Sequence, residues 1–360
     1  MIDNLRNVLG KTPLVLSVID EACHYAELIE QSPYEMLAGE LRVRKAAEMM
    51  FSKILVSHHP RDRDHYTTWK DEWDKVRKLL SGEKSFVNLG LTREEASTGI
   101  LAIRSFYANL AYTYRMAKLG PTLPGFPFWL TGFTIIPNFM GSKFAEKIVR
   151  DTCFTADVAK SPENMFWDYV KTDYFAKGGG STEVLEFIYR LRTIICSCMG
   201  VHENHPGTWN QLAKNTFFQK VNNVPGNGDV QKVLHSDTYY DALKFWYFPK
   251  DVKKEDGPFV YVPMSHVLSQ KRLQFIQDQS MKYYNGSIED WRTYGHAEGS
   301  LRISQEELKE MGLKESLMTV AGDTLVVANV FGFHRRAEAH VPSERLAIHG
   351  SIRYDSPFTL

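Results

Sequence analysis

His235 and Asp237 stand two residues apart in the motif H-S-D over 235–237. On a strand, residues at this spacing present their side chains on the same face. A neutral imidazole beside a carboxylate supplies two ligands of the kind that mid-series divalent metals accept. The spacing therefore predicts two ligands of a metal site whose third ligand comes from elsewhere in the chain.

His334 is the best candidate for that third ligand. A Gly-Asp turn at 322–323 leads into an apolar run over 325–330, and the histidine follows the end of this predicted strand. Two imidazoles and one carboxylate on one face of an octahedron leave three positions open, which is the arrangement of non-haem Fe(II) oxygenases. We therefore predict that His235, Asp237 and His334 bind Fe(II) and are the catalytic residues.

Arg345 is the predicted anchor for a co-substrate. In an oxygenase of this type, 2-oxoglutarate would fill two open positions, and the third would be left for O2. The far carboxylate of 2-oxoglutarate needs a cation, preferably the planar fork of arginine. Arg345 lies eleven residues after His334 and opens the strand predicted over 346–352. That position places it one strand away from the metal.

Other residues are weaker candidates for contact with the co-substrate or substrate. Trp246 and Tyr247 are neighbours on a predicted strand, and their side chains point to opposite faces. One of the two rings therefore points into the barrel. Lys220 and Asn222 share one face of the strand before the motif, where an outward lysine is the more common outcome. Three arginines, for which a surface or structural role is more common, are possible clamps for a substrate carboxylate: Arg335, Arg336 and Arg353.

The elements that position these residues fall into two parts. Apolar residues at three- and four-residue spacing predict helices over 14–30, 33–56, 66–80, 92–118 and 182–199. After residue 205, β-rich runs between turn residues predict strands over 216–224, 230–235, 243–248, 259–262, 317–320, 325–330 and 346–352. Two helices interrupt these strands, over 265–283 and 304–311, and the second opens with a Ser304…Glu307 capping box.

Many short strands with regular turns favour a sandwich or barrel over a doubly wound parallel sheet. We predict an α+β fold with a double-stranded β-helix core, which is a cupin-like jelly roll, and an N-terminal helical layer. The layer spans 1–120 and the catalytic core 121–360, and the two fold as one cooperative unit. The uncharged stretch 119–142 is rich in Pro and Gly, so we expect a packed loop and strand there rather than a membrane span.

Composition narrows the classes of function. The 360 residues carry 43 basic and 43 acidic side chains, so no basic surplus supports nucleic-acid binding. Four cysteines in a chain of this length indicate buried thiols rather than a disulfide framework, and no signal peptide is evident. We expect a cytoplasmic monomer or homodimer that acts on a small molecule.

The second half of the chain resembles the phytanoyl-CoA dioxygenase family of Fe(II)/2-oxoglutarate oxygenases, over roughly residues 205–355. The resemblance rests on H-S-D at 235–237, Trp246, the block G-P-F-V-Y-V-P-M-S-H over 257–266, the Gly-Asp turn, His334 and Arg345. It implies iron on the two histidines and the aspartate, and 2-oxoglutarate on the arginine. Met264 stands where the family usually has Gly. The retained Asp237 implies hydroxylation-type chemistry over halogenation.

The predicted function is therefore oxidation of an unactivated C–H bond, with succinate and CO2 as co-products. Near the motif, the sequence shows no basic cluster that would bind the phosphates of coenzyme A, which favours a small metabolite or biosynthetic intermediate as substrate. Hydroxylation, desaturation, cyclisation and epoxidation stay open. Two alternatives stay open as well: a non-catalytic jelly-roll module that binds a ligand or partner, and a cupin-like isomerase or hydrolase that uses its metal as a Lewis acid.

Overall fold

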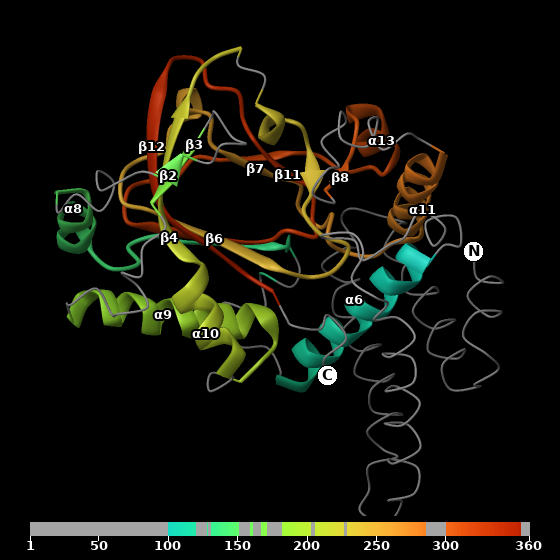
Figure 1. The fold of residues 1–360 in the computed structure, drawn as a ribbon, viewed down its shortest axis with the longest axis horizontal. Coiled ribbons are helices and arrows are strands. Elements are labelled where there is room, and N and C mark those ends of the chain that lie inside the picture. The colour runs from blue at the N-terminus through green and yellow to red at the C-terminus, as the bar shows by residue number, and fades with distance from the viewer. Residues whose placement is uncertain are drawn as a thin grey trace, which may run out of the picture.

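The chain folds around two β-sheets, with helices packed on the larger sheet and others beside the smaller one (Figure 1). The computed structural model describes residues 100–119, 128, 131–150, 159–160, 167–170, 182–202, 206–226, 229–285 and 300–353. The helices predicted over 14–30, 33–56 and 66–80 lie outside the described residues, as does most of the predicted layer 1–120.

The larger sheet has seven strands in the order β1-β10-β6-β12-β4-β3-β2. Its strands are β1 Phe133–Ile136, β2 Ala159–Lys160, β3 Trp167–Val170, β4 Thr216–Asn223, β6 Leu243–Phe248, β10 Thr324–Asn329 and β12 Ser343–Ile352. The strands that pair at its centre are far apart in the sequence, so long-range pairing builds the sheet.

The smaller sheet has five strands in the order β8-β5-β11-β7-β9. They are β5 His235–Ser236, β7 Phe259–Tyr261, β8 Leu301–Arg302, β9 Ser316–Met318 and β11 His334–Arg336. All the pairings between described strands are antiparallel. Two antiparallel sheets whose strands alternate along the chain make a jelly roll, and the predicted fold class is confirmed.

Helices cover the outer side of the larger sheet and one flank of the sandwich. They are α6 Ile100–Leu119, α8 Ser142–Arg150, α9 Thr182–Met199, α10 Pro206–Asn215, α11 Gln270–Asn285 and α13 Gln305–Glu310, with 3-10 turns η2 Val230–Lys232 and η3 Lys254–Asp256. In Figure 1, α9 and α10 run below β4 and β6, while α6, α11 and α13 gather on the side of β8. No described helix is both long and apolar enough to cross a bilayer.

Alternation along β6 divides the interior into two cores. Phe245 and Tyr247 pack with side chains of α8 and α9 on the outer side of the sheet. Trp246 and Phe248 point the other way, where they pack with Tyr261 of the smaller sheet. Successive side chains of a strand point to opposite faces, so a single strand with five buried residues contributes to both cores.

Several predicted elements match the structure and others differ for local reasons. The helix predicted over 182–199 and the strand over 243–248 have the observed bounds, and the capping box of Ser304 and Glu307 is present. The strand predicted over 230–235 is instead η2 followed by the two-residue β5. The difference arises at Asp229, because its carboxylate accepts a hydrogen bond from the Gln231 N–H and closes a local turn.

The helix predicted from residue 265 begins later, at Gln270, because a turn occupies the residues before it. Met264 adopts a left-handed conformation with φ 65°, and its N–H donates to the carbonyl of Thr131. Glycine adopts this conformation without strain, whereas the Cβ of methionine makes it unfavourable. The uncharged stretch 119–142 contributes β1, which pairs with β10.

Asp323 ties the larger sheet to the loop before α8. Its carboxylate accepts hydrogen bonds from the N–H groups of Met140 and Gly141, at 2.9 and 2.7 Å, and from the Tyr247 hydroxyl at 2.8 Å. Asp323 is 5% exposed and has φ 58°, a left-handed conformation that Asp and Asn tolerate better than most residues. The carboxylate therefore holds three donors at one turn, and one of them, the Tyr247 hydroxyl, is buried.

We expect Asp323→Ala to lower the free energy of unfolding by about 3 kcal/mol, because it leaves one buried and two partly buried donors without an acceptor. Asp323→Asn tolerates the same backbone and keeps one acceptor oxygen, so its loss should be smaller. Urea denaturation of the two variants checks this order. Equal stability of both variants and the wild type would contradict the role given to the carboxylate.

Candidate metal centre

Strand register brings the two predicted histidine ligands together. His235 on β5 and His334 on β11 are direct partners in the ladder, and their ring centroids lie 4.6 Å apart. Asp237 follows β5, and its N–H donates to the Val330 carbonyl at 2.9 Å. Residues that are about one hundred apart in sequence thus meet on one face of the smaller sheet.

Backbone carbonyls fix the orientation and tautomer of both imidazoles. His235 Nδ1 lies 2.7 Å from the Val233 carbonyl oxygen, and His334 Nδ1 lies 3.0 Å from that of Gly332. A carbonyl oxygen only accepts, so each Nδ1 carries the proton and donates it. Each Nε2 then presents a lone pair, which is the form that binds a metal.

The Asp237 carboxylate lies between the two Nε2 atoms. Its Oδ1 is 3.4 Å from Nε2 of His235, and its Oδ2 is 3.6 Å from Nε2 of His334. One ligand atom from each residue lies within 4.8 Å of the others. Two ligand atoms that each lie about 2.1 Å from one ion, at right angles, are about 3 Å apart. Small movements of these side chains would therefore bring their ligand atoms to binding distance of a single ion.

Unsatisfied polarity also fits a metal ion. His235 is 1% exposed, and within the described part of the chain its Nε2 makes no hydrogen bond. A buried nitrogen lone pair without a donor is costly, and a cation between the two imidazoles and the carboxylate would satisfy it. The donor set of two nitrogens and one oxygen suits Fe(II).

The electrostatic environment sets the protonation states that metal binding requires. Burial lowers the pKa of His235 to about 4, against the opposing pull of Asp237, so the ring is neutral at pH 7. Burial alone would raise the pKa of Asp237, but the positive charge of Lys244 outweighs it and holds this pKa well below its usual range. The site therefore offers a neutral ring and an ionised carboxylate.

Lys244 is a neighbour of the ligands that the sequence reasoning missed. Its Nζ lies 2.5 Å from Oδ2 of Asp237. Lys244 precedes Trp246 by two residues on β6, so the alternation that turned the tryptophan inward also turned the lysine inward. The sequence could have indicated this position of Lys244 through the face that it shares with Trp246.

Arg272 of α11 supports the two segments that carry the ligands. Its Nη2 donates to Ser236 Oγ at 3.1 Å and to the Phe331 carbonyl at 2.7 Å. The guanidinium also lies 3.7 Å from the ring centroid of Phe333, which precedes the second histidine. This buried contact holds the aspartate segment against the turn before β11, and the sequence carried no signal for it.

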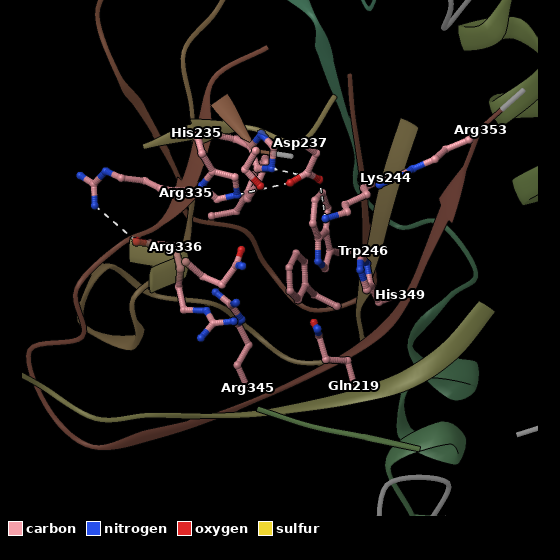
Figure 2. A pocket seen from close by; sticks show the side chains of 15 residues that line it. Gln219, His235, Asp237, Lys244, Trp246, Arg335, Arg336, Arg345, His349 and Arg353 are labelled. Atoms are coloured by element: carbon pink, nitrogen blue, oxygen red, sulfur yellow. Dashed lines mark hydrogen bonds and ion pairs between the residues drawn. The ribbon is translucent and has the colours of Figure 1, made fainter. Parts of the chain in front are cut away.

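The three predicted metal ligands line a cavity of about 210 Å³ that Arg345 also lines (Figure 2). Arg345 Nη1 donates to the Gly257 carbonyl at 2.7 Å. Gly257 has φ 67°, and a Cβ there would collide with the Asn223 side chain and the Ala337 carbonyl, so this turn requires glycine. The predicted anchor and the predicted ligands thus face one cavity.

The weaker candidates differ in their placement. Trp246 lines the cavity, where it stacks on His349 with centroids 4.9 Å apart. Lys220 forms an ion pair with Glu344, and Asn222 is exposed, so the structure places neither of them at the cavity. Gln219 of the same strand lines it instead. A shift of one residue on a strand exchanges its two faces.

His349 gives the fold a dependence on pH. Burial, with a further contribution from the Lys244 charge, lowers its pKa to about 3, whereas an unfolded histidine titrates near 6.5. The unfolded chain therefore binds an extra proton between these values. This contribution to stability is complete above pH 6.5 and is lost progressively as the pH falls toward 3.

We expect His349→Gln to lose about 2 kcal/mol less stability than the wild type between pH 6.5 and 4.5, since each pH unit contributes up to about 1.4 kcal/mol. Urea denaturation at the two pH values measures the difference. His340→Gln, at an exposed position, is the matched control. An unchanged pH dependence in the His349 variant would show that the buried ring is not responsible.

Comparisons with known proteins leave the family of this chain open. No protein-family model matches the chain, and no curated protein matches its sequence. Among solved structures, it is similar to the epimerase SnoN in complex with Fe3+, alpha ketoglutarate and nogalamycin RO. The identity is 14%, the match covers 62% of this chain and 79% of SnoN, and the TM-score is 0.39.

Two further structures are similar at the same level. HygX from Streptomyces hygroscopicus, with nickel and 2-oxoglutarate bound, is 16% identical over 64% of this chain and 87% of HygX, with a TM-score of 0.36. EvdO2 from Micromonospora carbonacea var. aurantiaca, complexed with 2-oxoglutarate, is 13% identical over 65% of this chain and 94% of EvdO2, with a TM-score of 0.38. At such identities and TM-scores, the function of this chain has to be argued from its own residues.

Proposed function

We propose that the chain is an Fe(II)- and 2-oxoglutarate-dependent dioxygenase that oxidises a C–H bond of a small metabolite or biosynthetic intermediate. The observation that carries the proposal is the convergence of His235, Asp237 and His334 on one cavity wall, with Arg345 lining the same cavity. The first three supply a metal face with open positions, and the arginine supplies a grip for a dicarboxylate.

Arg345 is suited to bind the far carboxylate of 2-oxoglutarate. Within the described ranges its side chain makes one hydrogen bond, to the Gly257 carbonyl, which leaves further N–H groups to donate. Burial, together with the charge of Arg336, lowers the pKa of Arg345. The positive charge of the guanidinium is therefore incompletely compensated by its surroundings, and a carboxylate that binds there stabilises it.

The other cavity residues orient the co-substrate and exclude water. Trp246, Phe259 and His349 form an aromatic wall, with Trp246 and Phe259 centroids 4.5 Å apart. When bound, iron with O2 and 2-oxoglutarate supplies the oxidising power, and 2-oxoglutarate leaves as succinate and CO2. The protein positions the reacting groups. Backbone carbonyls fix the orientation of the two imidazoles, and the aromatic wall shields the reacting groups from bulk water.

The alternatives explain less of the site. A Lewis-acid isomerase or hydrolase needs the three ligands but gives no reason for a buried arginine in the same cavity. A non-catalytic binding module gives no reason for a buried Nε2 lone pair on His235 that lacks a donor. Membership of the phytanoyl-CoA dioxygenase family stays a prediction, since no family model matches.

Anaerobic addition of Fe(II) and 2-oxoglutarate tests the proposal. We expect a weak visible absorption band in the green when both are present, and succinate formation once air is admitted. Absence of both signals would favour the binding module. Substrate turnover that proceeds without O2 would favour the Lewis-acid enzyme.

A further inference from the structure

Lys244 reaches across the interior of the jelly roll, from the larger sheet to the predicted metal ligands of the smaller one. It lies on β6, where the ladders pair it with Ala328 of β10 on one side and with Ser351 of β12 on the other. Asp237 follows β5 of the smaller sheet. Because two ladders hold the backbone of Lys244, its side chain approaches Asp237 from a defined direction.

Backbone hydrogen bonds also tie the segments of these two residues together. The Asp237 N–H donates to the Val330 carbonyl at 2.9 Å, and the Val330 N–H donates to the Ala242 carbonyl at 2.8 Å. Ala242 stands two residues before Lys244. Val330 therefore bridges the segment that carries the carboxylate and the strand that carries the ammonium group, so their spacing is set by the backbone.

Lys244 distinguishes the two carboxylate oxygens of Asp237. Each oxygen lies near one imidazole nitrogen at a similar distance: Oδ1 is 3.4 Å from Nε2 of His235, and Oδ2 is 3.6 Å from Nε2 of His334. The Lys244 Nζ lies 2.5 Å from Oδ2, so the ion pair is formed with that oxygen (Figure 2). An oxygen that already neutralises a cation is a poorer metal ligand, which leaves Oδ1 for the metal.

The ion pair is protected from competition. The side chains of Lys244 and Asp237 are 23% and 10% exposed, and partly buried pairs are screened by salt much less than surface pairs. Among the described residues that line the cavity, Asp237 is the only carboxylate. The ammonium group therefore has one acidic partner on this cavity wall, and that partner is a predicted metal ligand.

The number of oxygens that Asp237 gives to the metal decides whether O2 has a position. Two imidazoles and one carboxylate oxygen leave three positions of an octahedral ion open. 2-Oxoglutarate would fill two of them, and the third would be left for O2. If both carboxylate oxygens bound the metal, that third position would be lost.

We propose that Lys244 is a positioning residue that holds Oδ2 of Asp237 away from the metal, so that the carboxylate binds through Oδ1 and one position stays open for O2. This inference rests on the proposed function and deepens it, because it names the residue that keeps the oxygen position open. The lysine acts through Asp237, so its effect is separable from metal binding and from the grip of Arg345 on 2-oxoglutarate.

Nitric oxide tests the open position without turnover, since it binds Fe(II) where O2 would bind and gives an electron paramagnetic resonance signal. The protein is loaded with Fe(II) and 2-oxoglutarate without air, and nitric oxide is then added. We expect a full signal from the wild type. Lys244→Met should lower it at least about 10-fold, in line with the loss of a group that supports a metal ligand. Lys244→Arg keeps a cation at Oδ2 and should restore most of the signal.

Lys220→Met is the matched control, since this lysine pairs with Glu344 and does not line the cavity; it should keep the full signal. Bound Fe(II) and 2-oxoglutarate are measured in the same samples. Thermal denaturation checks the fold, and Lys244→Leu replaces Lys244→Met if that variant does not fold.

Four outcomes overturn the inference: a loaded wild type that gives no signal, a full signal from loaded Lys244→Met, loss of iron from that variant, or no recovery in Lys244→Arg. Failure of the wild type to bind Fe(II) and 2-oxoglutarate removes the proposed function as well. Normal loading of the wild type together with any of the four outcomes removes only the role given to Lys244.

Discussion

His235→Ala should reduce succinate formation by at least about 10³-fold and should weaken metal binding. Loss of a group that only supports a metal ligand typically costs 10–100-fold, so loss of the ligand itself should cost more. The ring lies opposite His334 in the ladder, and its Nδ1 is held by a carbonyl. The remaining imidazole and carboxylate would hold the ion on two atoms only. Succinate is measured by mass spectrometry, and bound Fe(II) by equilibrium dialysis.

Folding has to be checked in the same experiment, because the His235 ring is buried and its removal leaves a cavity. Thermal denaturation of the metal-free variant provides that check. His340→Ala, at an exposed position, is the control and should keep full activity. A folded His235 variant that retains more than a tenth of wild-type succinate formation would remove His235 from the metal site.

Arg345→Met should raise the 2-oxoglutarate concentration needed for half-maximal turnover by about 100-fold, with a much smaller change at saturation. Truncation of one partner of a buried charged hydrogen bond costs about 2–5 kcal/mol, and 2.7 kcal/mol corresponds to this factor. Arg345→Lys keeps the charge but loses the two-pronged geometry, so an intermediate effect of about 10-fold is expected. Initial rates across 2-oxoglutarate concentrations measure both.

Arg335→Met is the control for the arginine series, since Arg335 lines the same cavity but pairs with Glu315. It should change the 2-oxoglutarate requirement by less than about 3-fold, as expected for a partly exposed ion pair. A Lewis-acid isomerase or hydrolase would be indifferent to Arg345→Met. An unchanged 2-oxoglutarate requirement would therefore favour that class and would count against the dioxygenase.

Local patterns of the sequence were sufficient to predict much of the fold and to select the candidate ligands. The β-rich run over 243–248 predicted β6, and helical spacing over 182–199 predicted α9 with its observed bounds. The two-residue spacing of His235 and Asp237 predicted a shared face, and the turn before the last apolar strands singled out His334. These signals are local, since they depend on the period of a single strand or helix.

Tertiary structure alone decided the register between strands and therefore the content of the cavity. The pairing of His235 with His334, the place of Gln219 instead of Lys220, and the contact of Lys244 with Asp237 all depend on it. Because side chains alternate with a period of two, a slip of one residue exchanges a strand's faces without changing its local pattern. The sequence by itself thus determined the chemistry available to the site, and the long-range pairing of strands determined which groups meet there.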